Sequence, residues 1–293
     1  MSRRIPRQPG PRPHAFTEHL TRRDIDILTR LAEHQILTTS QITRAFFDHS
    51  RIARRRLTIL TRLEILDRFR FNLKAAGPEE YIYFLGLNGA AVRRPSVFGP
   101  DSRRHDTARS HRERVNNLLR SQRREHTLGA NDFFTRLLAD ARSSAGNRAL
   151  ARWWSEQHAT DAYGASGARI RPDGHGVWRA HGRTVGFWLE HDTGSEKHQQ
   201  LLDKLPGYEA AAHTGPIYPV LLWVPSTGRR DRLLVKLADH TRIPIAVAAH
   251  HPNPAGPIWH LPGSGRAPIA LHELPSNHGP IGATNPNRFD PNA

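Results

Sequence analysis

The chain has 293 residues, of which 43 are Lys or Arg and 27 are Asp or Glu, giving a formal net charge of +16. This positive excess favours a polyanionic partner, and nucleic acid in particular. The chain has no cysteine, which excludes disulfides and thiolate metal sites. It has no apolar run of the ~20 residues needed to span a bilayer, so we expect no membrane partner. We also expect no signal peptide, and therefore a cytoplasmic, DNA-associated protein.

Changes in composition predict five segments. Residues 1–15 are rich in Pro and Arg, which is typical of a disordered basic arm. Residues 16–98 are predicted to form a winged-helix DNA-binding domain, and residues 99–130 a basic linker containing a helix. Helices alternate with short apolar strands over residues 131–274, which predicts an α/β domain. Residues 275–293 are rich in Pro, Asn and Gly and are predicted to be a disordered tail.

The first domain shows the order of elements of a winged helix-turn-helix. Capping-box patterns at Thr21 and Thr38 predict the starts of two helices, and a third helix is predicted over residues 50–67. Residues 68–74 alternate strictly, so that Phe69, Phe71 and Leu73 are expected on one face of a strand. Residues 81–85 are predicted to return as the second strand of a hairpin. Three helices followed by a hairpin are typical of the winged helix-turn-helix.

The third helix carries the predicted DNA-binding surface. Its core face is predicted to contain seven apolar residues, namely Ile52, Ala53, Leu57, Ile59, Leu60, Leu63 and Leu66. A separate outward face is predicted for Arg51, Arg54, Arg55, Thr58 and Arg62, and arginine can bind guanine edges or phosphates in the major groove. Further contacts are predicted from the hairpin, by Arg68, Arg70 and Lys74. Residues 1–75 contain sixteen Lys or Arg against seven Asp or Glu, which favours DNA over a merely solvated face or a protein-docking surface.

Acidic residues and lysines gather at strand ends in the second domain. We expect Glu156 on a strand after Trp153 and Trp154, and Asp173 in a turn before the next strand. A buried strand is predicted to end in Glu190-His191-Asp192, followed by a helix that contains Lys197 and Lys204 and continues through Tyr208. The candidate catalytic residues are Asp173, Glu190, Asp192, Lys197, Lys204 and Glu156. The histidines are interpreted as surface or loop residues.

These residue types match metal-dependent nuclease chemistry. Glu190 and Asp192 are two positions apart and are expected on the same side of a strand, with Asp173 on the neighbouring strand. Three such carboxylates, Asp173, Glu190 and Asp192, are the candidate ligands for Mg²⁺, which would polarise a phosphate and activate a water. Lys197 or Lys204 would stabilise the developing charge. The alternative is that Glu190 and Asp192 only stabilise the start of the following helix.

Over residues 16–252 the chain resembles a known family. The runs RPDG, GFWLEHDTGSEK and LLDKLPGY, after ARWWSEQHA and the predicted winged helix, are similar to the replication-relaxation proteins of actinobacterial plasmids and mobile elements. The resemblance implies an α+β or α/β protein in which a restriction-endonuclease-like PD-(D/E)xK domain with a mixed sheet follows the winged helix. On that mapping Asp173 is the "PD" aspartate and Glu190 lies on the "(D/E)x" strand. The chain departs from the nuclease signature at Asp192, where the signature has lysine.

The sequence leaves three functions open. The preferred one is a DNA-binding accessory factor of a plasmid or mobile element, acting in replication, DNA relaxation or conjugative mobilisation. The second is a Mg²⁺-dependent endonuclease that nicks DNA and is targeted by the winged helix. The third is a winged-helix transcriptional repressor, which leaves the second domain unexplained. The expected partners are double-stranded DNA and other plasmid replication or transfer proteins, and a homodimer is left open.

Overall fold

The structure, a computed structural model, describes residues 20–71, 80–92, 108–120, 123–165, 167–194, 198–239 and 242–278. The predicted basic arm, Lys74 and Lys197 lie outside these residues. Of the predicted tail, residues 275–278 are described, and Asn277 exchanges backbone hydrogen bonds with Ile217. The chain from residue 275 to residue 278 is therefore part of the folded structure.

The chain's first described helices begin where their capping residues predict. The Thr21 side chain accepts from the Asp24 N–H while the Asp24 carboxylate accepts from the Thr21 N–H, and Thr38 forms the same reciprocal pair with Gln41. Both predicted capping boxes are confirmed, because each satisfies backbone N–H groups that a helix start leaves without partners. The helices are α2 (Arg22–His34), α3 (Thr39–Phe46) and α4 (Ser50–Arg62).

A three-stranded antiparallel sheet completes the N-terminal part. Its strands are β1 (Leu37–Thr38), β2 (Leu66–Phe71) and β3 (Glu80–Leu85), in the order β1-β3-β2. The predicted hairpin is present as the β2–β3 pair. Phe69 lies on β2 as predicted, and its side chain is 41% exposed. The buried residues of this sheet include Ile82 and Tyr83 of β3, Leu66 of β2 and Leu37 of β1.

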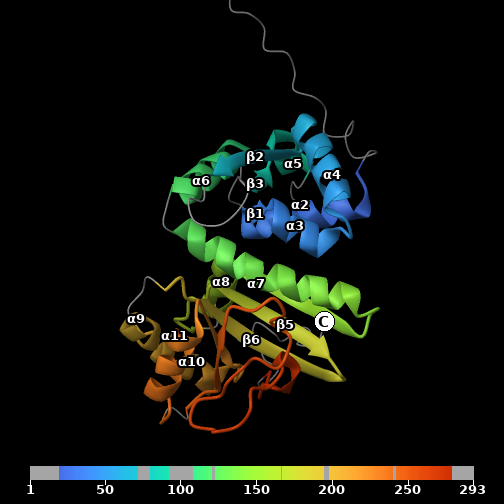
Figure 1. The fold of residues 1–293 in the computed structure, drawn as a ribbon. Coiled ribbons are helices and arrows are strands. Elements are labelled where there is room, and N and C mark those ends of the chain that lie inside the picture. The colour runs from blue at the N-terminus through green and yellow to red at the C-terminus, as the bar shows by residue number, and fades with distance from the viewer. Residues whose placement is uncertain are drawn as a thin grey trace, which may run out of the picture.

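A long helix, α7, joins the N-terminal part to the rest of the chain (Figure 1). Two shorter helices precede it, and the three are α5 (Leu87–Val92), α6 (Ala108–Arg120) and α7 (Arg123–Ser143). Helix α7 packs against α3 on one side and against strands of the second sheet on the other. Ion pairs Arg44–Asp132 (2.8 Å) and Arg142–Asp48 (2.6 Å) fix α7 to the N-terminal part. The predicted boundary between residues 130 and 131 falls inside this continuous helix.

The second sheet has five strands in the order β4-β5-β6-β7-β8. Strands β4, β5 and β6 are antiparallel neighbours, whereas β6, β7 and β8 are parallel. The strands are β4 (Arg148–Ser155), β5 (Gly174–Ala180), β6 (Arg183–His191), β7 (Val220–Val224) and β8 (Ile245–Ala249). The remaining elements are α8 (Glu156–Ala165), α9 (His198–Leu202), α10 (Leu205–Thr214), α11 (Thr227–Lys236) and the short helix η1 (Leu271–Glu273).

Successive residues along a strand of the second sheet face opposite sides, and each side packs against a separate set of helices. Phe187 packs with Phe133 of α7 on one face, in a core that continues into the N-terminal part. Trp188 packs on the other face with Tyr208 of α10, in a core that also contains residues of α8, α9 and α11. The α+β class is therefore confirmed, with one antiparallel and one mixed sheet. Within the described residues, none of the helices is both long and apolar enough to cross a bilayer.

Candidate functional site

The first candidate site is an exposed basic surface on α4. We define the α4 arginine face as Arg51, Arg54, Arg55, Thr58 and Arg62. All four arginines are exposed, and Thr58 is half-buried. Ala53, Leu57 and Leu60 are buried on the opposite side of the helix. The helical period therefore separates the arginines from the core as predicted.

The core face of α4 is narrower than predicted. Ile52 was expected in the apolar stripe but is 52% exposed, and Ile59 is half-buried beside the arginines. Arg56 lies one turn after Ile52 on the same flank of the core, where it donates to both carboxylate oxygens of the buried Asp24.

The four arginines of the α4 arginine face have no carboxylate partner among the residues that the structure describes. Arg54, Arg55 and Arg62 line an open hollow together with Thr58 and Ile59. The Thr58 hydroxyl donates to the Arg54 carbonyl at 2.8 Å. A cluster of exposed guanidinium groups that lack a carboxylate partner among the described residues is electrostatically suited to an external polyanion.

The hairpin places two further arginines near one aromatic ring. Arg68 lies over the Tyr81 ring at 4.0 Å, and Arg70 lies 5.7 Å from the same ring centroid. Such stacking holds an arginine side chain while leaving N–H groups available to a ligand.

The second candidate site is a cleft beside the second sheet, where Asp173, Glu190 and Lys204 line one cavity of about 550 Å³. Asp173 directly precedes β5, and its N–H donates to the Leu189 carbonyl at 2.9 Å. The His191 N–H in turn donates to Asp173 Oδ2 at 2.7 Å. Pairing of β5 with β6 therefore brings Asp173 and Glu190 to the same end of the sheet, as predicted.

Glu190 is buried between a lysine and a tyrosine. Lys204 Nζ donates to Glu190 Oε2, and the Tyr208 hydroxyl donates to Oε1. Burial and then the charge of Asp173 raise the pKa of Glu190 to about 7, although Lys204 acts in the opposite direction. Burial alone would also raise the pKa of Asp173, but His126, Lys204 and the His191 N–H together lower it. The two neighbouring carboxyl groups thus differ in their affinity for a proton.

Asp192 does not join this pair, which corrects the predicted catalytic and metal sets. Its carboxylate is buried and accepts from Arg229 of α11 and from the Gly194 N–H. Asp192 follows the end of β6, so it faces α11, whereas Glu190 faces the segment between α9 and α10. Within the described residues, no group of three or more His, Asp or Glu side chains is placed to hold a metal ion. The predicted three-carboxylate Mg²⁺ site is therefore not formed.

The predicted helix after Asp192 is divided in two. Helix α9 ends at Leu202 and α10 begins at Leu205, and the break between them contains Lys204. This break turns the Lys204 side chain toward Glu190, and Tyr208 follows one turn later in α10. Tyr208 was not predicted as a site residue, although its spacing of four from Lys204 was visible in the sequence.

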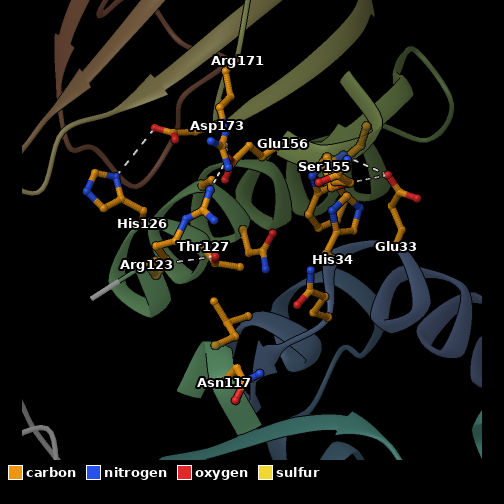
Figure 2. A pocket seen from close by; sticks show the side chains of 16 residues that line it. Glu33, His34, Asn117, Arg123, His126, Thr127, Ser155, Glu156, Arg171 and Asp173 are labelled. Atoms are coloured by element: carbon orange, nitrogen blue, oxygen red, sulfur yellow. Dashed lines mark hydrogen bonds and ion pairs between the residues drawn. The ribbon is translucent and has the colours of Figure 1, made fainter. Parts of the chain in front are cut away.

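Glu156 is the first residue of α8 and not a strand residue, which corrects its predicted location. Its Oε1 accepts from both Arg123 and Arg171, each at 2.5 Å. These three residues line a second cavity of about 350 Å³ that also contains Asp173 (Figure 2). They line the first cavity as well, so the two cavities share these three residues.

Histidines contribute more to the interior than the sequence indicated. His34, His175 and His191 are buried, and burial lowers the pKa of His175 to about 3. His126 lies beside the cleft, with Nδ1 3.9 Å from Asp173 Oδ2 (Figure 2). No sequence signal identified His126, because α7 reaches Asp173 only through tertiary packing.

Comparison with known proteins gives one family. Residues 28–220, more than half of the chain, match the family model described as Replication-relaxation. Searches of curated proteins and of solved structures give no significant match. The matched segment contains the α4 arginine face as well as Asp173, Glu190 and Lys204. The chain therefore belongs to the replication-relaxation family.

Proposed function

We propose that this protein binds double-stranded DNA of a plasmid or mobile element through the α4 arginine face, as an accessory factor in replication or DNA relaxation. The observation that carries the proposal is the cluster of exposed arginines on α4 without carboxylate partners among the described residues. Helix α4 follows α3 after a short turn and precedes a hairpin, which is the order of the winged helix-turn-helix. Membership of the replication-relaxation family supports the proposed process.

The test is duplex binding by a triple variant of the α4 arginine face. Replacing Arg51, Arg55 and Arg62 with Ala should weaken binding and reduce the slope of log K against log salt by about 0.9 for each lost phosphate contact. The control replaces Arg183, Arg232 and Arg242, which are exposed on the second part of the chain and carry the same total charge. An unchanged salt slope in the α4 variant would reject direct contact by this helix.

A Mg²⁺-dependent nuclease is a second candidate, favoured by the joint location of Asp173, Glu190 and Lys204 in one cavity. Mg²⁺ is often held by one or two carboxylates and keeps several waters, so Asp173 and Glu190 fit as a donor pair. Burial and then the charge of Asp173 raise the pKa of Glu190, and a cation bound beside the two carboxylates would act against both effects. When bound, the ion would polarise a phosphate oxygen and lower the pKa of a water. Lys204 is placed to stabilise negative charge in the same cavity.

Supercoiled plasmid distinguishes the two candidates. Nicking with Mg²⁺ or Mn²⁺ that disappears in both D173A and E190A would support the nuclease. Plasmid that is bound but remains intact would support the accessory factor alone.

A further inference from the structure

Two arginines from distant parts of the chain converge on one carboxylate oxygen at the cleft. Arg123 is the first residue of α7, and Arg171 lies in the loop that leads into β5. Both donate to Glu156 Oε1, yet their side chains remain 59% and 61% exposed. Figure 2 shows Arg123, Glu156 and Arg171 gathered next to Asp173.

A role in stability explains this arrangement poorly. Ion pairs that are this exposed contribute little to folding, because water and salt screen them. Each guanidinium has five N–H donors, and a single carboxylate oxygen leaves most of them for other acceptors. The three groups by themselves carry a net positive charge, and the carboxylate of Asp173 lies in the same cavities. Arginine forks match the oxygens of a phosphate group as well as those of a carboxylate.

The two cavities that Glu156 lines limit what can bind there. They measure about 350 and 550 Å³, which is the size range of sites for small ligands. A nucleotide or a short single strand fits this range, whereas a DNA duplex requires a much wider surface. Asp173 lines both cavities, so a strand held by Arg123 and Arg171 would lie beside the Asp173–Glu190 pair.

We propose that Arg123 and Arg171 bind the phosphodiester backbone of a single DNA strand, which displaces Glu156 from the two guanidinium groups. Glu156 occupies the site in the free protein and competes with the phosphate. This inference rests on the proposed function, since it takes DNA as the ligand. It adds a second contact that recognises an unpaired strand, separate from the duplex contact of α4.

The test measures binding of a short fluorescent single-stranded oligonucleotide by anisotropy. The double variant R123A/R171A should bind about tenfold more weakly or worse, because charge-assisted hydrogen bonds are lost. Its slope of log K against log salt should fall by about 0.7 for each lost phosphate contact. E156Q should bind more tightly than the wild type, because it removes the competing charge. Addition of E156Q to R123A/R171A should give no such gain.

Glu209 provides a matched control, because it forms a 2.9 Å ion pair with the exposed Arg242 and lines neither cavity. E209Q should leave oligonucleotide binding unchanged. Equal gains in E209Q and E156Q would overturn the proposal, since only net charge would then matter. Unchanged affinity in R123A/R171A would also overturn it. Competition by inorganic phosphate that equals competition by the oligonucleotide, phosphate for phosphate, would overturn the assignment to a DNA strand.

The α4 triple variant keeps the two proposals distinguishable. If it loses duplex binding while R123A/R171A keeps single-strand binding, only the cleft proposal fails. If duplex binding is unaffected while R123A/R171A loses single-strand binding, only the α4 proposal fails.

Discussion

Glu33, in the last turn of α2, accepts hydrogen bonds from both the backbone N–H and the hydroxyl of Ser155, at 3.0 and 2.9 Å. Ser155 ends β4, so this contact joins the N-terminal helices to the second sheet next to the cleft. His158 of α8 adds a third contact, with Nδ1 3.0 Å from the same Glu33 oxygen. The Glu33 carboxylate therefore links the N-terminal helices, which carry the α4 arginine face, to the second sheet beside the cleft.

Glu33 should make the protein sensitive to acid. Burial alone would raise the pKa of Glu33, but His158, His34 and the Ser155 N–H lower it to about 2. An acid with a lowered folded pKa stabilises the fold above its unfolded pKa of 4.5, and this stability is lost as pH falls from 4.5 toward 2. Between pH 4.5 and pH 2, E33Q should lose less free energy of unfolding than the wild type, by on the order of 2 kcal/mol. Urea unfolding at several pH values measures this difference. Parallel curves for the two proteins would contradict the prediction.

Arg55 and Arg56 are neighbours on α4 and should have opposite roles. R56A leaves the buried Asp24 without its guanidinium partner and should lower the free energy of unfolding by about 3 kcal/mol. R55A removes an exposed side chain without a carboxylate partner among the described residues, and should change it by less than about 0.5 kcal/mol. Urea unfolding and duplex binding, measured together, check both. We expect R55A to weaken DNA binding at unchanged stability, and similar stability of the two variants would refute the assignment.

Ionisation of Glu190 should lower the free energy of unfolding. Its pKa is raised in the fold, so the fold loses stability as pH rises from the unfolded value of 4.5 through about 7. E190Q lacks this ionisation. The stability of E190Q relative to the wild type should therefore increase by about 1–3 kcal/mol between pH 5 and pH 8. Urea unfolding at both pH values measures this difference. A constant or decreasing difference would show that ionisation of Glu190 does not destabilise the fold.

Two helical glycines should respond oppositely to alanine. A Cβ at Gly129 of α7 would lie 2.0 Å from Cε1 of the buried His191, so G129A requires the ring or the helix to move. A Cβ at Gly164 of α8 meets nothing within 4 Å. G164A should raise the free energy of unfolding by about 0.5 kcal/mol, whereas G129A should lower it by about 1–3 kcal/mol. Thermal unfolding of the two variants, compared with the wild type, is the measurement, and a stabilised G129A would show that His191 moves freely.

Local sequence patterns predicted the elements whose form depends on near neighbours. Thr21 and Thr38 predicted helix starts because a capping box involves residues only three positions apart. The arginines of α4 were predicted to be exposed because the helical period separates them from Leu57 and Leu60. The location of Asp173 and Glu190 at the same end of the sheet was predicted, because the sequence indicated both of the adjacent strands.

Tertiary packing decided the rest, because it depends on residues far apart in the chain. Ile52 was expected in the core but is 52% exposed, whereas Arg56, one turn later, binds a buried carboxylate of α2. Asp192 was expected beside Glu190, but Arg229 of α11 takes its carboxylate.

The sequence by itself determined the basic helix, the hairpin and the acidic strand ends, since charge and periodicity are local properties. Only the tertiary structure decided that Lys204 reaches Glu190 and that Arg123 and Arg171 meet at Glu156. The first contact joins the segment between α9 and α10 to β6, and the others join α7 and the loop before β5 to α8. No spacing along the chain encodes how these separate elements pack.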